Sequence, residues 1–357
     1  MKFLRNIVHA VACLTLFASG LGGAVAHRSS ESWHDPSPHR VRFVTVDKGV
    51  RIEVLDWGGV GRDLLLLAGS GNTAHVYDDF APKLARFGHV YGMTRRGYGN
   101  STHPESGYSE RRLAEDVLEA IRRLHLRKPV LIGHSMSGEE LTRLGDEHSK
   151  LLGGLIYLDA TSDPKDVPAD DSAYMDLIRK LPAGMRKGGA KTADDRKSFQ
   201  ALDQWYARRI GVAFPESELR NMYETNPDGS VGKFRTSDRI SDLVGAGVEA
   251  RDYSKISVPI LEITPVWKCT QDTGPNYSCI DHPGREPGYQ PKNEEERAAI
   301  EAFEKADDAY TLRWNKNLMS AKGRVRIVDI VGADHYLFLS NGDDILNEVE
   351  AFLKDYH

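Results

Sequence analysis

The stretch that decides the fold is PVLIGHSMSG, residues 129–138. A short apolar run leads into Gly133, Ser135 stands at a turn, and the residues after it have the pattern of a helix. A G-x-S-x-small turn between strand and helix strains its serine, so the neighbours must be small, as Gly133 and Ser137 are. The turn lifts the Ser135 hydroxyl above the strand, beside a helix N-terminus whose partial positive charge favours an oxyanion. We therefore interpret Ser135 as a candidate nucleophile rather than a helix-capping serine.

Strands and helices alternate on both sides of this turn. The unbroken apolar run LLLLA (64–68) is typical of a strand buried on both faces. From residue 64 the order strand, helix, strand, helix, strand, helix, strand predicts an α/β fold with a mostly parallel central sheet flanked by helices. An antiparallel hairpin precedes it, with its turn at Asp47-Lys48-Gly49. The predicted strands are 41–46, 50–57, 64–68, 89–93, 129–133, 154–159, 258–264 and 325–331, and the predicted helices are 75–87, 110–126, 136–149, one from about 293, and 343–354.

Two segments break the alternation. Residues 162–255 are charged and helical in character, without an apolar run that predicts a buried strand. We expect them to form a helical cap inserted over the sheet. A second insertion, 267–320, holds two cysteines, several prolines and glycines, and a charged helix. The predicted plan is a signal peptide (1–26), a flexible leader (27–39), an α/β core (40–161 and 256–357) and the helical cap (162–255).

The first 26 residues have the features of a secretory signal peptide. Lys2 and Arg5 are positive, residues 7–18 are mostly apolar, and Ala24-Val25-Ala26 forms a small-residue cleavage site. The apolar run is shorter than the roughly 20 residues that span a bilayer, which argues against a stable membrane anchor. We expect cleavage after Ala26 and an exported protein, periplasmic or secreted.

The composition is that of a globular protein and argues against a protein that binds nucleic acid. The 357 residues are 40% hydrophobic and 28% charged, which is globular composition with material for a large core. The net charge is −5, and becomes −7 when the signal peptide is removed with its two positive residues, Lys2 and Arg5. Long basic blocks are absent, so we expect no nucleic-acid partner.

The cysteines favour a disulfide. Of the three, Cys13 lies in the expected signal peptide, and Cys269 and Cys279 remain ten positions apart. Two such cysteines in an exported chain most often pair. We expect a disulfide that closes a short loop. No CxxC, HExxH or carboxylate-rich calcium loop indicates a metal.

Four segments together resemble the α/β-hydrolase family, and the resemblance covers nearly all of the chain after the leader. They are LLLLAGSGNTAHVYDDFAPKL (64–84), YGMTRRGYGNS (91–101), VLIGHSMSG (130–138) and VGADHYLF (331–338). The chain departs from the family at Ala68-Gly69, where His-Gly is usual, at Thr94, where Asp is usual, and at Ser137, where Gly is usual. These departures touch the periphery of the expected site rather than its nucleophile.

The resemblance implies roles for further residues. The backbone amides of Met136, just after the nucleophile, and Ser70, in the glycine loop after the strand 64–68, would form an oxyanion hole. His335 follows the last strand, where family members carry the general base of the catalytic serine. The order Ser135 then His335 along the chain also fits this fold.

The acid that orients His335 is open among several aspartates. Most family members place it after the strand before the last one, but residues 265–268 contain no carboxylate and the first available is Asp272. A second placement known in the fold follows the strand after the nucleophile helix, and Asp159 stands there. We prefer Asp159 over Asp272, with Asp281 among the remaining alternatives.

We therefore expect a serine hydrolase that cleaves a carboxylic ester or lactone of small-molecule size through an acyl-enzyme, with no cofactor and no metal. A serine nucleophile argues against epoxide hydrolase and dehalogenase chemistry, which uses an aspartate in this fold. Amidase, thioesterase, C–C hydrolase and acyltransferase activities remain alternatives, because the fold hosts many reactions. The fold also serves non-catalytic binding proteins, a further alternative. The sequence leaves the substrate and the oligomeric state open.

Overall fold

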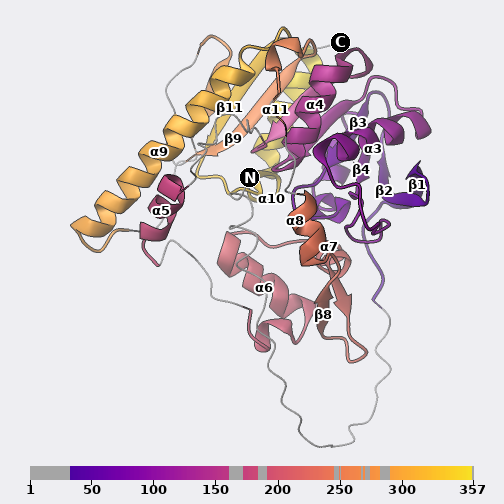
Figure 1. The fold of residues 1–357 in the computed structure, drawn as a ribbon, viewed down its shortest axis with the longest axis horizontal. Helices are drawn as coiled ribbons and strands as arrows, with labels where there is room; N and C mark the ends of the chain where they lie inside the picture. Colours follow the sequence, from indigo (N-terminus) through magenta and orange to yellow (C-terminus); the bar gives the residue numbers. More distant parts are fainter. Residues whose placement is uncertain are drawn as a thin grey trace, which may run out of the picture.

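Nine strands form one sheet, in the order β1-β2-β4-β3-β5-β6-β9-β11-β10 (Figure 1). The computed structural model describes residues 33–160, 172–183, 191–244, 249, 251–266, 268–269, 274–281 and 290–355. The β1–β2 and β2–β4 pairs are antiparallel and all other neighbouring pairs are parallel, which confirms the predicted sheet. The strands are β1 (Arg40–Asp47), β2 (Val50–Gly58), β3 (Asp63–Leu67), β4 (His89–Met93), β5 (Val130–His134), β6 (Gly154–Leu158), β9 (Ile260–Val266), β10 (Tyr277–Ile280) and β11 (Val325–Val331).

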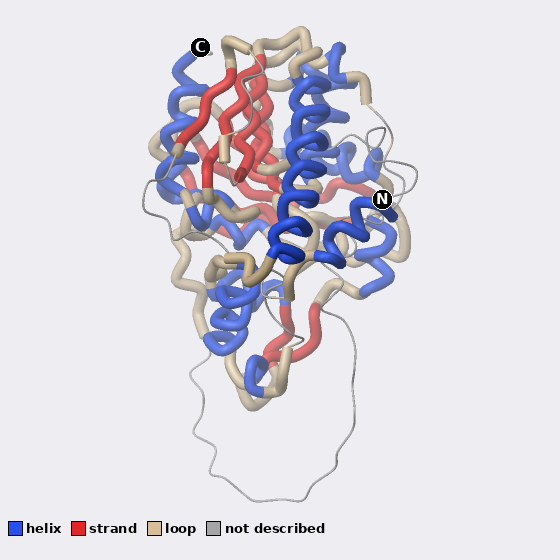
Figure 2. The backbone as a smooth tube through the Cα atoms, turned by 90° about the vertical axis from the view of Figure 1, so that its left-hand side faces the viewer, coloured by secondary structure: helices blue, strands red, loops and turns tan. Residues whose placement is uncertain are grey.

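Helices cover both faces of the sheet, as Figure 2 shows. Alternate residues of the buried strands face opposite sides: Leu64 and Leu66 pack in one apolar cluster, Leu65 and Leu67 in the other. The first cluster includes α11, η1 and α2, and the second includes α3 and α4. The helices of the core are η1 (Ala74–Tyr77), α2 (Ala81–Leu84), α3 (Glu110–Arg123), α4 (Ser137–His148), η2 (Ser149–Leu151), η4 (Tyr253–Lys255), α9 (Glu294–Leu318), α10 (Leu337–Ser340) and α11 (Gly342–Asp355).

The helix predicted over 75–87 was wrong in its extent. The structure has two short pieces there, η1 and α2, separated by residues 78–80. Pro82 stands in the first turn of α2, where its missing N–H is tolerated. It cannot donate to a carbonyl four residues back, so one helix cannot run through this segment. The segment after β3 therefore forms two short helices instead of one long helix.

The segment predicted as a helical cap also contains strands. A two-stranded antiparallel sheet, β7 and β8, stands beside the helices and turns at Asn226-Pro-Asp-Gly229. Gly229 has φ 84°, and its N–H donates to the Asn226 carbonyl at 2.9 Å. In Figure 1, α6, α7 and β8 lie together below the sheet. The elements here are α5 (Ser172–Lys180), η3 (Asp194–Arg196), α6 (Phe199–Ile210), α7 (Glu216–Met222), β7 (Tyr223–Thr225), β8 (Val231–Phe234) and α8 (Asp238–Val244).

The second insertion adds an edge to the sheet. β10 pairs with β11 in parallel, although the sequence predicted no strand between 267 and 320. Cys279 of β10 forms a disulfide with Cys269, with 5.8 Å between their Cα atoms, as the cysteine spacing predicted. The disulfide joins the chain just after β9 to this edge strand. The long helix α9 follows, with α5 beside it in Figure 1.

Part of the segment predicted as a flexible leader, residues 33–39, contacts the α/β core. The expected signal peptide and residues 27–32 lie outside the described residues, but 33–39 are placed, and the His39 side chain is 4% exposed. Within residues 33–39, the His39 side chain pairs with the buried carboxylate of Asp78, so this end of the predicted leader contacts the folded chain. None of the helices within the described ranges combines the length and apolarity needed to cross a membrane.

Candidate active site

Ser135 sits in the strained turn that its neighbours predicted. It follows β5 directly, has φ 54°, and its N–H donates to the Leu158 carbonyl at 3.2 Å. A left-handed conformation of a non-glycine residue costs about 1–3 kcal/mol, which the surrounding packing must supply. A Cβ added at Gly138 would stand 1.5 Å from the Ala160 carbonyl oxygen. The start of α4 therefore packs directly on the chain after β6, and this packing holds the turn.

Ser137, where the family pattern has glycine, is accommodated by hydrogen bonds. Its hydroxyl lies 3.0 Å from the Leu67 carbonyl and 2.9 Å from the His134 carbonyl, to which it can donate. A Cβ added at Gly133 would lie 2.7 Å from the Ser137 oxygen, so there is no room for a side chain at position 133. The departure from the family pattern thus leaves the turn intact.

His335 and Asp159 meet at the carboxyl edge of the sheet. Asp159 follows β6 and His335 lies in the loop after β11, and β9 alone separates these two strands. The Nδ1 atom of His335 is 2.5 Å from Oδ2 of Asp159. With Nδ1–H donating to the carboxylate, the other ring nitrogen, Nε2, is the one free to accept a proton. The His335 side chain is 46% exposed and that of Asp159 is 25% exposed, so the pair is open to solvent.

The other candidate acids are not brought to His335 in the described structure. Asp281 is exposed at the end of β10, on the far side of β11. Asp272 lies outside the described residues. Asp334, the neighbour of His335 in sequence, turns toward the C-terminus of α6, since a Cβ added at Gly211 would lie 2.8 Å from its carboxylate. Of these aspartates, Asp159 is the one whose carboxylate the structure places on the imidazole.

The loop after β3 lies directly against Ser135. A Cβ added at Gly69 would be 3.1 Å from Cβ of Ser135, so only glycine permits this approach. The amides of Ser70 and Met136 have no hydrogen-bond partner within the described part of the chain. Met136 also occupies the N-cap position of α4, without a capping hydrogen bond from its side chain. Two unpaired N–H groups beside the serine match what an oxyanion hole requires.

Arg95 supports this loop from below. Its guanidinium makes a two-point ion pair with Glu140 of α4, with N–O distances of 2.8 and 2.7 Å. It also donates to the carbonyls of Ala68 and Gly69 at 3.2 and 3.4 Å. The Arg95 side chain is buried and its positive charge is paired with the Glu140 carboxylate, so it supports the loop rather than binding a ligand.

His134 holds the loop that carries His335. Its Nε2–H donates to the His335 carbonyl at 2.9 Å, and the two rings lie 4.5 Å apart between centroids. Burial, reinforced by the nearby His335, lowers the pKa of His134 well below its usual value. A neutral His134 beside His335 adds no positive charge that would resist protonation of the base.

Glu218, on α7, ties the cap to the loop after β3. Its buried carboxylate accepts hydrogen bonds from Asn72 Nδ2 at 2.9 Å, from the Thr73 amide at 3.0 Å, and from the Thr73 hydroxyl. Asn72 in turn accepts a 3.0 Å hydrogen bond from Tyr336, the residue after His335. Sequence reasoning missed Glu218, because nothing in the pattern of the insertion distinguishes it from the insertion's many surface carboxylates.

The titration of Glu218 makes stability depend on pH. Burial raises its pKa from 4.5 to about 7, against the hydrogen bonds from Thr73 and Asn72. In the unfolded chain this carboxyl group ionises near its ordinary pKa of 4.5, whereas in the folded protein it keeps its proton up to about pH 7. The stability that the protonated group contributes below pH 4.5 is therefore lost as the pH rises through 7. The Glu218→Gln variant mimics the protonated acid. We expect its free energy of unfolding, relative to the wild type, to rise by about 3 kcal/mol from pH 4.5 to 8.

Urea unfolding at four pH values in this range measures that difference. Glu216→Gln is the matched control, since Glu216 also lies on α7 but is 47% exposed and should show no such trend. Parallel stability curves for wild type and Glu218→Gln would contradict the assignment.

Comparisons with known proteins agree with this architecture. The sequence matches the model of the family described as "Alpha/beta hydrolase family" over residues 64–348. A fluoroacetate dehalogenase of Burkholderia sp. is 35% identical over 107 residues, 29% of this chain and 35% of that protein. N-formylmaleamate deformylase of Pseudomonas putida is 29% identical over 157 residues, 43% of this chain and 56% of that protein. The chain thus spans between a third and little more than half of these relatives.

Solved structures share the fold over most of the chain. The crystal structure of E-2-(acetamidomethylene)succinate hydrolase has a TM-score of 0.59 at 18% identity, covering 88% of this chain and 99% of that one. A marine microorganism esterase has a TM-score of 0.55 at 18% identity, covering 84% and 98%. At such low identity these likenesses bear on the fold alone.

Proposed function

We propose that this chain, which belongs to the alpha/beta hydrolase family, is a serine hydrolase that cleaves a carboxylic ester or a lactone through an acyl-enzyme. The observation that carries the proposal is the 2.5 Å contact between His335 Nδ1 and Asp159, at the same sheet edge as the strained Ser135. A serine hydroxyl reacts only when a neighbouring base removes its proton, and the base needs its tautomer set.

Each residue would act in a two-step displacement. Nε2 of His335 takes the proton of the Ser135 hydroxyl as its oxygen attacks the substrate carbonyl carbon. The amides of Ser70 and Met136 stabilise the oxyanion of the tetrahedral intermediate. His335 then gives its proton to the leaving alkoxide, and the acyl group stays on Ser135. Water, deprotonated by His335, hydrolyses this ester, while Asp159 stabilises the imidazolium formed in each step.

One relative suggests amide bonds as a second substrate class. N-formylmaleamate deformylase, by its name, removes the formyl group of N-formylmaleamate. The same site would serve, with His335 giving its proton to an amine. Fluoroacetate dehalogenase chemistry is disfavoured, because position 135 is serine where that chemistry in this fold uses aspartate. The proposed partner is therefore a small acyl compound, and the mechanism requires no cofactor.

Export belongs to the same proposal. It rests on the positive, apolar and A-x-A segments within residues 1–26, which lie outside the described structure. The intact mass of protein recovered outside the cytoplasm should correspond to a chain that starts at His27. Recovery of the full chain from the cytoplasm alone would contradict export.

A fluorophosphonate probe tests the hydrolase proposal without knowledge of the substrate. We expect one adduct, located by peptide mass spectrometry on Ser135, with labelling that falls when His335 is replaced by alanine. A panel of aryl esters, lactones and anilides then separates the ester class from the amide class. Folded protein that takes no label and hydrolyses none of the panel would favour the non-catalytic binding protein instead.

A further inference from the structure

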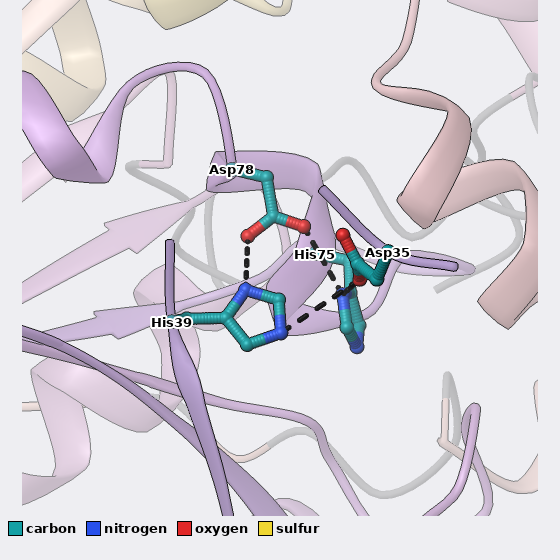
Figure 3. Close-up of side chains that lie close together, drawn as sticks. All are labelled: Asp35, His39, His75 and Asp78. Carbon is teal, nitrogen blue, oxygen red and sulfur yellow. Dashed lines mark hydrogen bonds and ion pairs between the residues drawn. The ribbon is translucent and has the colours of Figure 1, made fainter. Parts of the chain in front are cut away.

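Two histidines and two aspartates from separate parts of the chain meet beside the edge of the sheet (Figure 3). Asp35 and His39 come from the segment before β1, and His75 and Asp78 come from η1 and the residue after it. The exposed fraction is 4% or less for three of these side chains and 23% for Asp35. None of the four takes part in the chemistry proposed for Ser135.

We propose that this cluster binds a zinc ion. One nitrogen or oxygen atom from each residue lies within 4.8 Å of those of the other three. His75 Nδ1 is 3.1 Å from Asp78 Oδ2 and 3.5 Å from Asp35 Oδ2, and His39 Nε2 is 3.7 Å from Asp35 Oδ2. The ligands of a tetrahedral zinc ion at normal bond lengths lie about 3.3 Å apart. The atoms of Asp35, His39 and His75 stand near this spacing and would be the protein ligands, while Asp78 stays hydrogen-bonded to Nδ1 of His39 and orients that ring.

Each histidine also faces a second carboxylate oxygen on its other ring nitrogen. The Nδ1–H of His39 donates to Asp78 Oδ1 at 2.8 Å, which leaves Nε2 bare to bind a metal. Nε2 of His75 is buried without a hydrogen-bond partner among the described residues, and it lies 3.6 Å from Glu53 Oε2. Metal-binding histidines characteristically donate their second N–H to such a carboxylate, which orients the ring.

The carboxylates around this cluster carry negative charge that a bound cation would neutralise. The side chains of Asp78 and Glu53 are 1% exposed, and that of Asp35 is 23% exposed. Within the described ranges, no lysine or arginine forms an ion pair with any of the three carboxylates. The groups that also contact Asp78 are neutral donors, the indole of Trp57 at 3.1 Å and the hydroxyl of Ser217 at 2.6 Å. Buried carboxylates without a positive partner are costly.

Zinc fits this donor set better than magnesium or calcium, which prefer oxygen ligands throughout. Bound zinc would link the segment before β1 to η1, and through Ser217 to α7 of the cap. The competing occupant is a proton on His75. Although burial opposes it, the nearby carboxylates of Asp35, Asp78 and Glu53 hold the pKa of His75 well above its usual value. The test must therefore distinguish a bound metal from an ion-pair network.

Zinc content and thermal unfolding of tag-free protein provide that test. The protein is stripped with EDTA, incubated with zinc chloride and desalted. We expect elemental mass spectrometry to find about one zinc per chain, and the melting temperature to rise by roughly 5 °C with zinc at a hundredfold excess over the dissociation constant. Cobalt in place of zinc should give the visible absorption of a four-coordinate ion.

The variants Asp35→Asn and His39→Gln should lose the retained zinc and the thermal shift. Both residues precede β1, so circular dichroism should show an unchanged fold. His89→Gln is the matched control: His89 also contacts a buried aspartate, Asp56 at 2.8 Å, but it lies outside the cluster. This variant should retain zinc. Wild type without bound zinc, or equal zinc in wild type and His39→Gln, would overturn the proposal.

Discussion

Replacing Ser135 with alanine is expected to lower kcat for any hydrolysed substrate by about 10⁴–10⁶-fold. The turn explains this effect. Its backbone, with φ 54° at Ser135, holds the Ser135 hydroxyl beside the unpaired amides of Ser70 and Met136. Alanine keeps the turn, because its Cβ occupies the same space. Substrate binding should therefore change little, and the loss should appear in kcat rather than KM. Steady-state kinetics with the best ester of the panel measures both constants.

Ser137→Ala is the control for this experiment. It removes a hydroxyl two positions away, whose acceptor Leu67 keeps a second hydrogen bond from Tyr77 at 2.9 Å. We expect it to stay within about tenfold of wild type, since it loses one ordinary hydrogen bond. If Ser135→Ala kept the wild-type rate while Ser137→Ala lost it, the nucleophile would be misassigned.

The Asp159→Asn variant should lose about 10⁴-fold in kcat at neutral pH. An amide in place of the carboxylate no longer fixes the proton on Nδ1 of His335, and it does not stabilise the imidazolium that forms during the reaction. Asparagine is the informative replacement because Asp159 has φ 48°, a conformation that asparagine tolerates well. The fold should therefore survive, and the pH–rate profile should report the altered imidazole.

Three other aspartates serve as comparisons for Asp159. Asp334→Asn changes the neighbour of His335 that turns toward Gly211, and it should leave kcat nearly unchanged. Asp281→Asn, at the exposed end of β10, should also be close to wild type. The remaining comparison is Asp272→Asn. Loss of activity in this variant, with activity kept in Asp159→Asn, would move the orienting acid to the second insertion.

The core could be predicted because its strands are encoded locally. Apolar runs such as residues 64–68 are short and bounded by turn residues, which is typical of buried strands, and β11 begins and ends where predicted. The insertion was harder. Tyr223–Thr225 is too short to show an alternating pattern, and only the Asn226-Pro-Asp-Gly229 turn indicates the β7–β8 pair. The edge strand β10 likewise depends on its neighbour β11, which lies far along the chain.

Sequence alone determined the α/β sheet, the strained turn at Ser135 and the position of His335 after the last strand. Each depends on local pattern, or on motifs whose spacing reflects one strand and its turn. Only tertiary structure placed the Asp159 carboxylate on His335, Glu218 against the loop after β3, and Asp35 and His39 beside His75. These contacts join residues that are 36 to 176 positions apart in the chain. Their geometry depends on how the strands are ordered and how the cap packs, which no local pattern of residues encodes.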